Sequence, residues 1–233
     1  MKKNILIFLV ICAFCDNLLS QSQNPNNLLR NVLKKLQIAK DYSVEANIKV
    51  DLPFINMLPI NAKIYTKQPD KFKVESKSIA IVPRQGFDQI AKILKDTTQF
   101  SAVTQGEEMI EKNKTTIVNI FSQVDTSDLI LGKLWIDVQQ NIILKSQLTT
   151  RSNGTILTEY EYGSQIAYGL PDKMTFTVDI KKFKVPKMIA ALTSSKKKQG
   201  DTAEEKRRKI FIKLQNYQVN KGLKDEIFVK EKQ

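Results

Sequence analysis

From residue 42 onward, apolar and polar side chains alternate in segment after segment of this chain, and this period of two constrains the fold more than any other feature. In the first segment the apolar positions are Val44, Ala46, Ile48 and Val50. Similar alternation recurs around residues 60–65, 71–75, 102–108, 115–122, 133–138, 142–150, 155–162, 173–180 and 209–219. Successive side chains of a strand point to opposite faces, so the pattern predicts antiparallel strands with one apolar and one solvated face.

Turn signals separate several of these segments. They fall at residues 140–141 (QN), 153–154 (NG) and 169–172 (GLPD), which suit tight connections between neighbouring strands. We find no internal repeat and no domain linker. The sequence therefore predicts one domain of about ten strands, connected mostly as a meander. The natural twist of so long a sheet would curl it into an open, incomplete barrel.

Two segments have a helical period instead. Residues 24–40 place Leu28, Leu29, Val32, Leu33 and Leu36 on one face, with Asn24 as the cap before Pro25. Residues 87–94 suit a second, short helix. The predicted fold class is mainly β with a helical lid (α+β), in which both helices cover the concave face of the sheet. For the first helix, lying on a membrane surface is the alternative.

The first residues have the layout of a secretory signal peptide. Lys2 and Lys3 precede an apolar run over residues 5–14, and a cleavage point is expected near Ser20. We therefore expect a cleaved leader at 1–20 and a single domain at 21–233. The alternative is an uncleaved N-terminal anchor.

Composition excludes several kinds of chemistry. The chain has no histidine, and its two cysteines, Cys12 and Cys15, lie in the expected leader. Metal sites and histidine-based catalysis are therefore not expected, and neither is a cofactor. Glu159 and Glu161 share a strand face and are the one candidate catalytic pair. We interpret them as solvated surface residues and predict no enzyme.

A formal net charge of +13 favours acidic partners. Export makes nucleic acid the least suitable of these and leaves an anionic membrane surface or an acidic protein. A basic cluster at 196–198 and 206–209 fits attraction to anionic head groups, with a solvated loop as the alternative. Simple solubility would also account for the net charge.

Five short stretches resemble a known family. They are residues 64–72 (IYTKQPDKF), 134–137 (LWID), 141–145 (NIILK), 169–172 (GLPD) and 216–222 (NYQVNKG). They are spread from residue 64 to residue 222, so the resemblance covers most of the chain beyond the expected leader. The pattern resembles the outer-membrane lipoprotein-sorting proteins of the LolA-like superfamily.

This resemblance implies an incomplete antiparallel barrel with a helical lid, whose hydrophobic cavity receives acyl chains of a lipoprotein or lipid in the periplasm. It implies no catalysis and no cofactor, and it implies membrane-bound donors or acceptors as partners. Gln68 stands where arginine is common in such carriers, so the handover step need not carry over. The alternative is an envelope sensor or interaction module on the same fold without cargo transfer.

The apolar face of the sheet supplies the candidate acyl-chain site. A sheet of this size with two short helices is expected to leave a dry groove, in which each buried methylene contributes about 0.8 kcal/mol. The alternative is an interior filled by the protein's own side chains. Residues 185–192 are a candidate gate. The predicted lining residues are Val44, Ala46, Ile48, Val50, Ile60, Ala62, Ile64, Phe72, Val74, Phe87, Ile90 and Leu94.

Overall fold

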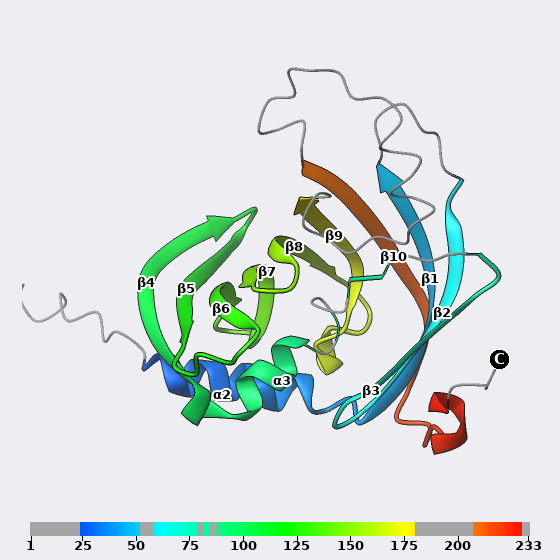
Figure 1. The fold of residues 1–233 in the computed structure, drawn as a ribbon, viewed down its shortest axis with the longest axis horizontal. Coiled ribbons are helices and arrows are strands. Elements are labelled where there is room, and N and C mark those ends of the chain that lie inside the picture. The colour runs from blue at the N-terminus through cyan, green and yellow to red at the C-terminus, as the bar shows by residue number, and fades with distance from the viewer. Residues whose placement is uncertain are drawn as a thin grey trace, which may run out of the picture.

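The structure is a computed structural model, and it describes residues 24–51, 58–78, 82–83, 87, 89–179 and 207–229. These residues form a ten-stranded antiparallel sheet with two α-helices, α2 (Pro25–Leu36) and α3 (Gln89–Lys95) (Figure 1). The strands are β1 (Asp41–Asp51), β2 (Ile60–Lys67), β3 (Lys71–Ser76), β4 (Phe100–Ile110), β5 (Asn113–Ser122), β6 (Leu129–Asp137), β7 (Ile142–Thr150), β8 (Gly154–Tyr162), β9 (Pro171–Asp179) and β10 (Arg207–Val219). Short 3₁₀ turns are η2 (Thr97–Gln99), η3 (Ile166–Tyr168) and η4 (Asp225–Phe228).

The strand order is β3-β2-β1-β10-β9-β8-β7-β6-β5-β4. Every neighbouring pair is consecutive in sequence except β1 and β10, which pair antiparallel and place Ile48 opposite Ile212. The predicted meander is therefore confirmed, with one seam that joins the first strand to the last. Because β3 and β4 lie at opposite edges, the connection containing α3 crosses from one edge to the other.

The sheet is strongly curved and open, and α2 and α3 lie against each other on its inner side (Figure 1). Leu28, Leu29 and Val32 of α2 are buried in the same apolar core as the inward residues of the strands. The predicted incomplete barrel with a helical lid is confirmed. None of the helices in the described residues is long and apolar enough to cross a membrane.

Helix α2 begins and ends for local reasons. The Asn24 side chain accepts a hydrogen bond from the backbone N–H of Asn26 at 2.9 Å, and Pro25 fills the first helical position. The helix ends at Leu36, four residues before the predicted end at 40. Beyond it, the backbone N–H of Lys40 donates to the Asn220 side chain at 2.7 Å, whereas a continuing helix would direct it to the Leu36 carbonyl.

The predicted facing of the first strands is confirmed. Val44, Ile48 and Ile64 are completely buried, whereas Glu45 and Lys49 are exposed. The turn predictions hold as well, because Asn141, Gly154 and Gly169 all have positive φ (54°, 69° and 66°). Such a backbone conformation favours glycine and asparagine.

A second, smaller group of buried apolar residues lies on the outer side of the sheet. Trp135 lies between Leu134 and Ile136, which belong to the main core, so its side chain faces the opposite way. Its indole N–H donates to the Glu108 carboxylate at 2.7 Å, and the ammonium groups of Lys133 and Lys145 each lie 4.8 Å from the ring centroid. These contacts bury the only tryptophan of the chain to 4% exposure.

Three predicted features lie outside the described residues. They are the leader at 1–20, the candidate gate at 185–192, and the basic cluster except for Arg207, Arg208 and Lys209 at the start of β10.

Candidate functional site

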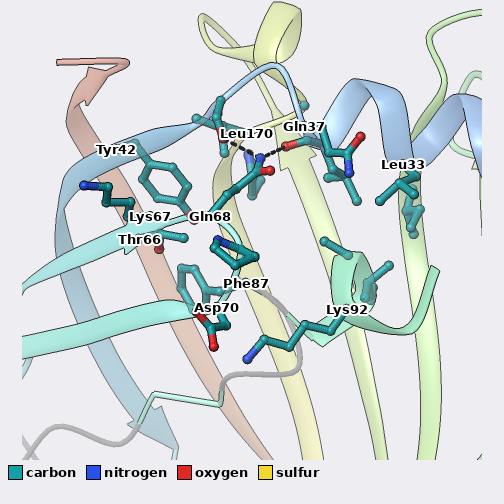
Figure 2. Close-up of a pocket in the computed structure, with 18 of the residues that line it drawn as sticks. Leu33, Gln37, Tyr42, Thr66, Lys67, Gln68, Asp70, Phe87, Lys92 and Leu170 are labelled. Atoms are coloured by element: carbon teal, nitrogen blue, oxygen red, sulfur yellow. Dashed lines mark hydrogen bonds between the residues drawn. The ribbon is translucent and has the colours of Figure 1, made fainter. Parts of the chain in front are cut away.

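A pocket of about 100 Å³ lies on the inner side of the sheet, between the end of α2, helix α3, the turn joining β2 to β3, and strands β8 to β10 (Figure 2). Its wall is mainly apolar and aromatic. The apolar and aromatic lining residues are Leu33, Leu36, Ala39, Tyr42, Phe87, Ile90, Ala91, Ile143, Tyr160, Tyr162, Leu170, Pro171, Met174 and Tyr217.

Four tyrosines form much of this wall, and the hydroxyls of three of them lie within hydrogen-bond distance of other protein groups. The Tyr160 hydroxyl is 3.1 Å from the Ser146 hydroxyl, Tyr162 donates to the Ile143 carbonyl at 2.9 Å, and Tyr217 donates to the Pro171 carbonyl at 2.7 Å. Burial raises the pKa of Tyr160 to about 12 and the pKa values of Tyr162 and Tyr217 well above 10. With their hydroxyls occupied, these residues offer mainly ring carbon to the pocket.

Gln68 ties the β2–β3 turn to the end of α2. Its side-chain amide donates to the Ala39 carbonyl at 2.8 Å and reaches the Leu36 carbonyl at 3.4 Å. The two carbonyls lie at the end of α2 and just beyond it, where helical partners are lacking. Glutamine therefore serves as a neutral bridge at the position where the family resemblance leads us to expect arginine.

One side of the pocket is basic. Four lysines line it, Lys67 and Lys71 from the sheet and Lys92 and Lys95 from α3, against the single carboxylate of Asp70 (Figure 2). Lys67 and Lys71 both bond the Asp225 carboxylate, and these hydrogen bonds lower the pKa of that carboxyl to about 2. Alternation along β2 and β3 puts the side chains of Lys67 and Lys71 on the outer face of the sheet with Asp225, whereas Thr66 and Phe72 face inward. The basic side chains that remain beside the hydrocarbon wall are therefore those of Lys92 and Lys95.

Thr66, between these two zones, contributes a hydroxyl that is buried without a partner. Within the described part of the chain, it is the one buried side-chain polar atom left unbonded. Thr66 lines the pocket, and a buried hydroxyl without a partner is costly, so a small movement that exposed it to a polar group would be favourable.

A second, wider hollow of about 780 Å³ lies at the other end of β1 and β2. Its lining is mostly polar or charged and includes Glu45, Asn47, Lys63, Glu75 and Gln215. An apolar ligand would find little dry surface there, so we take the first pocket as the candidate site.

The predicted site residues are distributed between these places. Phe87 and Ile90 line the first pocket, and Ala46, Ile60 and Ala62 reach the second. The remaining predicted residues pack in or against the core and line neither hollow: Val44, Ile48, Val50, Ile64, Phe72, Val74 and Leu94.

The prediction missed the tyrosine wall and the lysines. The period of two on β8 carried a signal for Tyr160 and Tyr162, because they alternate with Glu159 and Glu161. Those two glutamates are exposed and line neither hollow, and Glu161 pairs with Lys173 at 2.7 Å. Within the described residues, no three acidic or metal-binding side chains come together as a metal site.

A curved ten-stranded sheet with helices packed in its concavity defines a class of fold, and comparison with solved structures gives that class a name. No protein-family model and no curated protein sequence matches the chain. It is similar to a LolA superfamily protein from Nitrosomonas europaea (TM-score 0.56, 10% identity, covering 90% of this chain and 99% of that one).

Two further solved structures agree. One is a DUF1329 family protein from Desulfovibrio piger (TM-score 0.54, 12% identity, covering 88% of this chain and 95% of that one). The other is a putative outer membrane lipoprotein-sorting protein domain from Vibrio parahaemolyticus (TM-score 0.52, 9% identity, covering 88% and 97%). The chain therefore has a LolA-like fold, as its sequence predicts.

Proposed function

We propose that the chain is an exported carrier that binds acyl chains of a lipoprotein or lipid on the concave side of its sheet, and that it acts in outer-membrane lipoprotein sorting. The main support is the aromatic, apolar pocket beneath α2 and α3. The fold adds support, because a structure similar to this one is described as a putative lipoprotein-sorting domain. The proposal includes no catalytic step and no cofactor.

The size of the pocket defines what binding requires. A volume of about 100 Å³ equals roughly three water molecules in the liquid. It therefore holds only part of an acyl chain. We propose that the rest of the chain extends along the inner face, where the predicted residues of β1 to β3 form the wall. Ligand entry then displaces side chains that now fill the core.

Native mass spectrometry of the purified chain tests this function. We expect bound lipid in the wild type and its loss in Ala91→Trp, because Ala91 is half-buried on the pocket wall and an indole would fill the space. Val103→Trp is the matched control, since Val103 is exposed on β4 and lines neither hollow. Equal lipid occupancy in the two variants would contradict the assignment of this pocket.

Export is the second part of the proposal. We propose that residues 1–20 are a leader cleaved near Ser20 and that residues 21–233 work in the periplasm. N-terminal sequencing of the protein recovered from the periplasm of a Gram-negative host tests it. A chain that still begins at Met1 would contradict the proposed cleavage.

A sensor or interaction module on the same fold is the second candidate function. The small volume of the pocket favours it, because such a module needs no room for cargo. It would emerge from native mass spectrometry without lipid while still binding a protein partner.

A further inference from the structure

The outward side of helix α2 carries basic side chains that lead to the mouth of the pocket. Arg30, Lys34 and Gln37 are exposed and follow one another at spacings of four and three residues, so they lie along one face of the helix. The buried residues of α2 hold the opposite face in the core. Gln37 caps the helix and lines the pocket, so this face ends at the pocket itself.

Helix α3 borders the mouth from the other side. Its residues Ile90 and Leu94 are buried, whereas Lys92 and Lys95 are exposed and line the pocket (Figure 2). Residues three apart on a helix are neighbours, so the two lysine side chains start from the same side of α3. Because α2 and α3 pack against each other, their exposed basic residues form one surface around the pocket mouth. We call this surface the basic rim, and it consists of Arg30, Lys34, Lys92 and Lys95.

The positive charge of the rim comes mainly from α2. Residues 24–40 contain four basic side chains and no acidic one, whereas Asp88 and Asp96 flank α3 in the sequence. Asp70 is the single carboxylate that lines the pocket. Elsewhere on the strands, three lysines pair with glutamates at 2.7 or 2.8 Å, but no ion pair among the described residues involves α2. The charge of α2 is therefore left for an external partner.

The kind of contact follows from what the helices have already buried. The apolar face of α2 lies in the core, so the helix cannot insert that face into a bilayer, and its outward side can bind only through charge. Exposed basic side chains spread over two helices suit a layer of anionic head groups, where each contributes roughly fivefold in affinity. The pocket opens within this same surface.

We propose that the basic rim docks on an anionic membrane surface, with the mouth of the pocket turned toward the lipid. Docking itself needs no ligand in the pocket, whereas its use for receiving an acyl chain rests on the proposed function. A chain that leaves the bilayer at the rim would enter the apolar pocket without crossing bulk water. Every methylene kept out of water avoids a cost of its own.

Co-sedimentation of the full chain with vesicles tests the docking. One set of vesicles is phosphatidylcholine alone, and the other also contains phosphatidylglycerol. We expect binding to the anionic vesicles only, and its loss in about 1 M salt, where the screening length falls to about 3 Å. The triple variant Arg30→Gln, Lys34→Gln, Lys95→Gln should bind anionic vesicles about a hundredfold more weakly.

A second triple variant is the matched control. Lys49→Gln, Lys63→Gln, Lys213→Gln removes the same charge from exposed positions on the outer face of β1, β2 and β10. We expect this variant to keep most of the affinity of the wild type, because these lysines lie away from the rim. A loss equal to that of the rim variant would mean that net charge alone drives binding, and would overturn the assignment to the rim.

The pocket variant separates docking from the proposed function. Ala91→Trp fills the pocket but leaves the rim charges in place, so it should bind anionic vesicles as the wild type does. Wild-type docking without any bound lipid in native mass spectrometry would contradict the carrier and leave the docking face. Equal binding to both kinds of vesicle, or to neither, would overturn the docking and leave the carrier. Full binding by the rim variant would also overturn it, because another basic region would then be responsible.

Discussion

Tyr160 gives the pocket a measurable signature at the scale of a single residue. Burial raises its pKa from 10.0 to about 12. An acid with a raised folded-state pKa contributes stability below its unfolded pKa of about 10, and that contribution is lost as the pH rises through the folded pKa. We expect the tyrosinate absorbance of Tyr160→Phe to differ from that of the wild type only near pH 12. A difference already complete near pH 10 would show an exposed hydroxyl.

Gln68 permits a second prediction at this scale. Gln68→Ala removes the donor to the Ala39 and Leu36 carbonyls, so we expect the free energy of unfolding to fall by about 1 kcal/mol. Chemical denaturation measures this change. Gln99→Ala is a control, because the Gln99 side chain bonds the neighbouring Asp96 on the surface rather than a carbonyl of α2. An equal loss of unfolding free energy in both variants would mean that the hydrogen bonds from Gln68 to the end of α2 do not stabilise the fold.

Individual residues also show where sequence reasoning succeeds. The facing of Val44, Ile48 and Ile64 followed from alternation alone, because a strand leaves each side chain only two directions. The ion pair between Lys67 and Asp225 could not be found in this way, since it joins residues 158 positions apart.

Burial also limits which positions can test binding. A charge at the completely buried Ile48 would unfold the chain rather than report on a ligand.

At the scale of elements, α2 is held by its apolar face. Leu29 is 1% exposed in the core, whereas Leu33 is half-buried at the pocket. We expect Leu29→Ala to lower the free energy of unfolding by about 2–5 kcal/mol and Leu33→Ala by less. Thermal denaturation followed by circular dichroism compares the two. The reverse order would place the other face of α2 on the sheet.

Element boundaries depend on contacts that a local pattern does not contain. The period of α2 continues toward residue 40, but the helix ends at Leu36 and the backbone N–H of Lys40 bonds the distant Asn220 side chain instead of a helical carbonyl. Conversely, the turns at residues 140–141 and 153–154 were found because a positive φ leaves a local signature in residue choice. Tyr160 and Tyr162 of the pocket wall are an intermediate case. The alternation on β8 predicts that both side chains share one face of the sheet, but only the folded structure shows that this face lies beside α2 and α3.

At the scale of the whole molecule, one seam decides whether the sheet is a single unit. Strands β4 to β10 form one meander and β1 to β3 another, and they join only where β1 pairs with β10. Alternation in the sequence predicts both meanders but contains no information on which strands meet at the seam. Yet inward residues from both meanders share one core with α2, including Ile64 and Ile120. That shared core favours cooperative unfolding of the two meanders.

Trp135 makes this cooperativity measurable, because it is the only tryptophan and lies on β6, four strands from the seam. Ile212→Ala removes a side chain that is 1% exposed at the seam, and should lower the free energy of unfolding by about 2–5 kcal/mol. If the sheet unfolds as one unit, tryptophan fluorescence in a denaturant titration must report this loss in full. Ile120→Ala, at 1% exposure beside β6, is the control that shifts the transition in either case. A shift in Ile120→Ala without one in Ile212→Ala would mean that the meanders unfold separately and that the seam is a hinge between them.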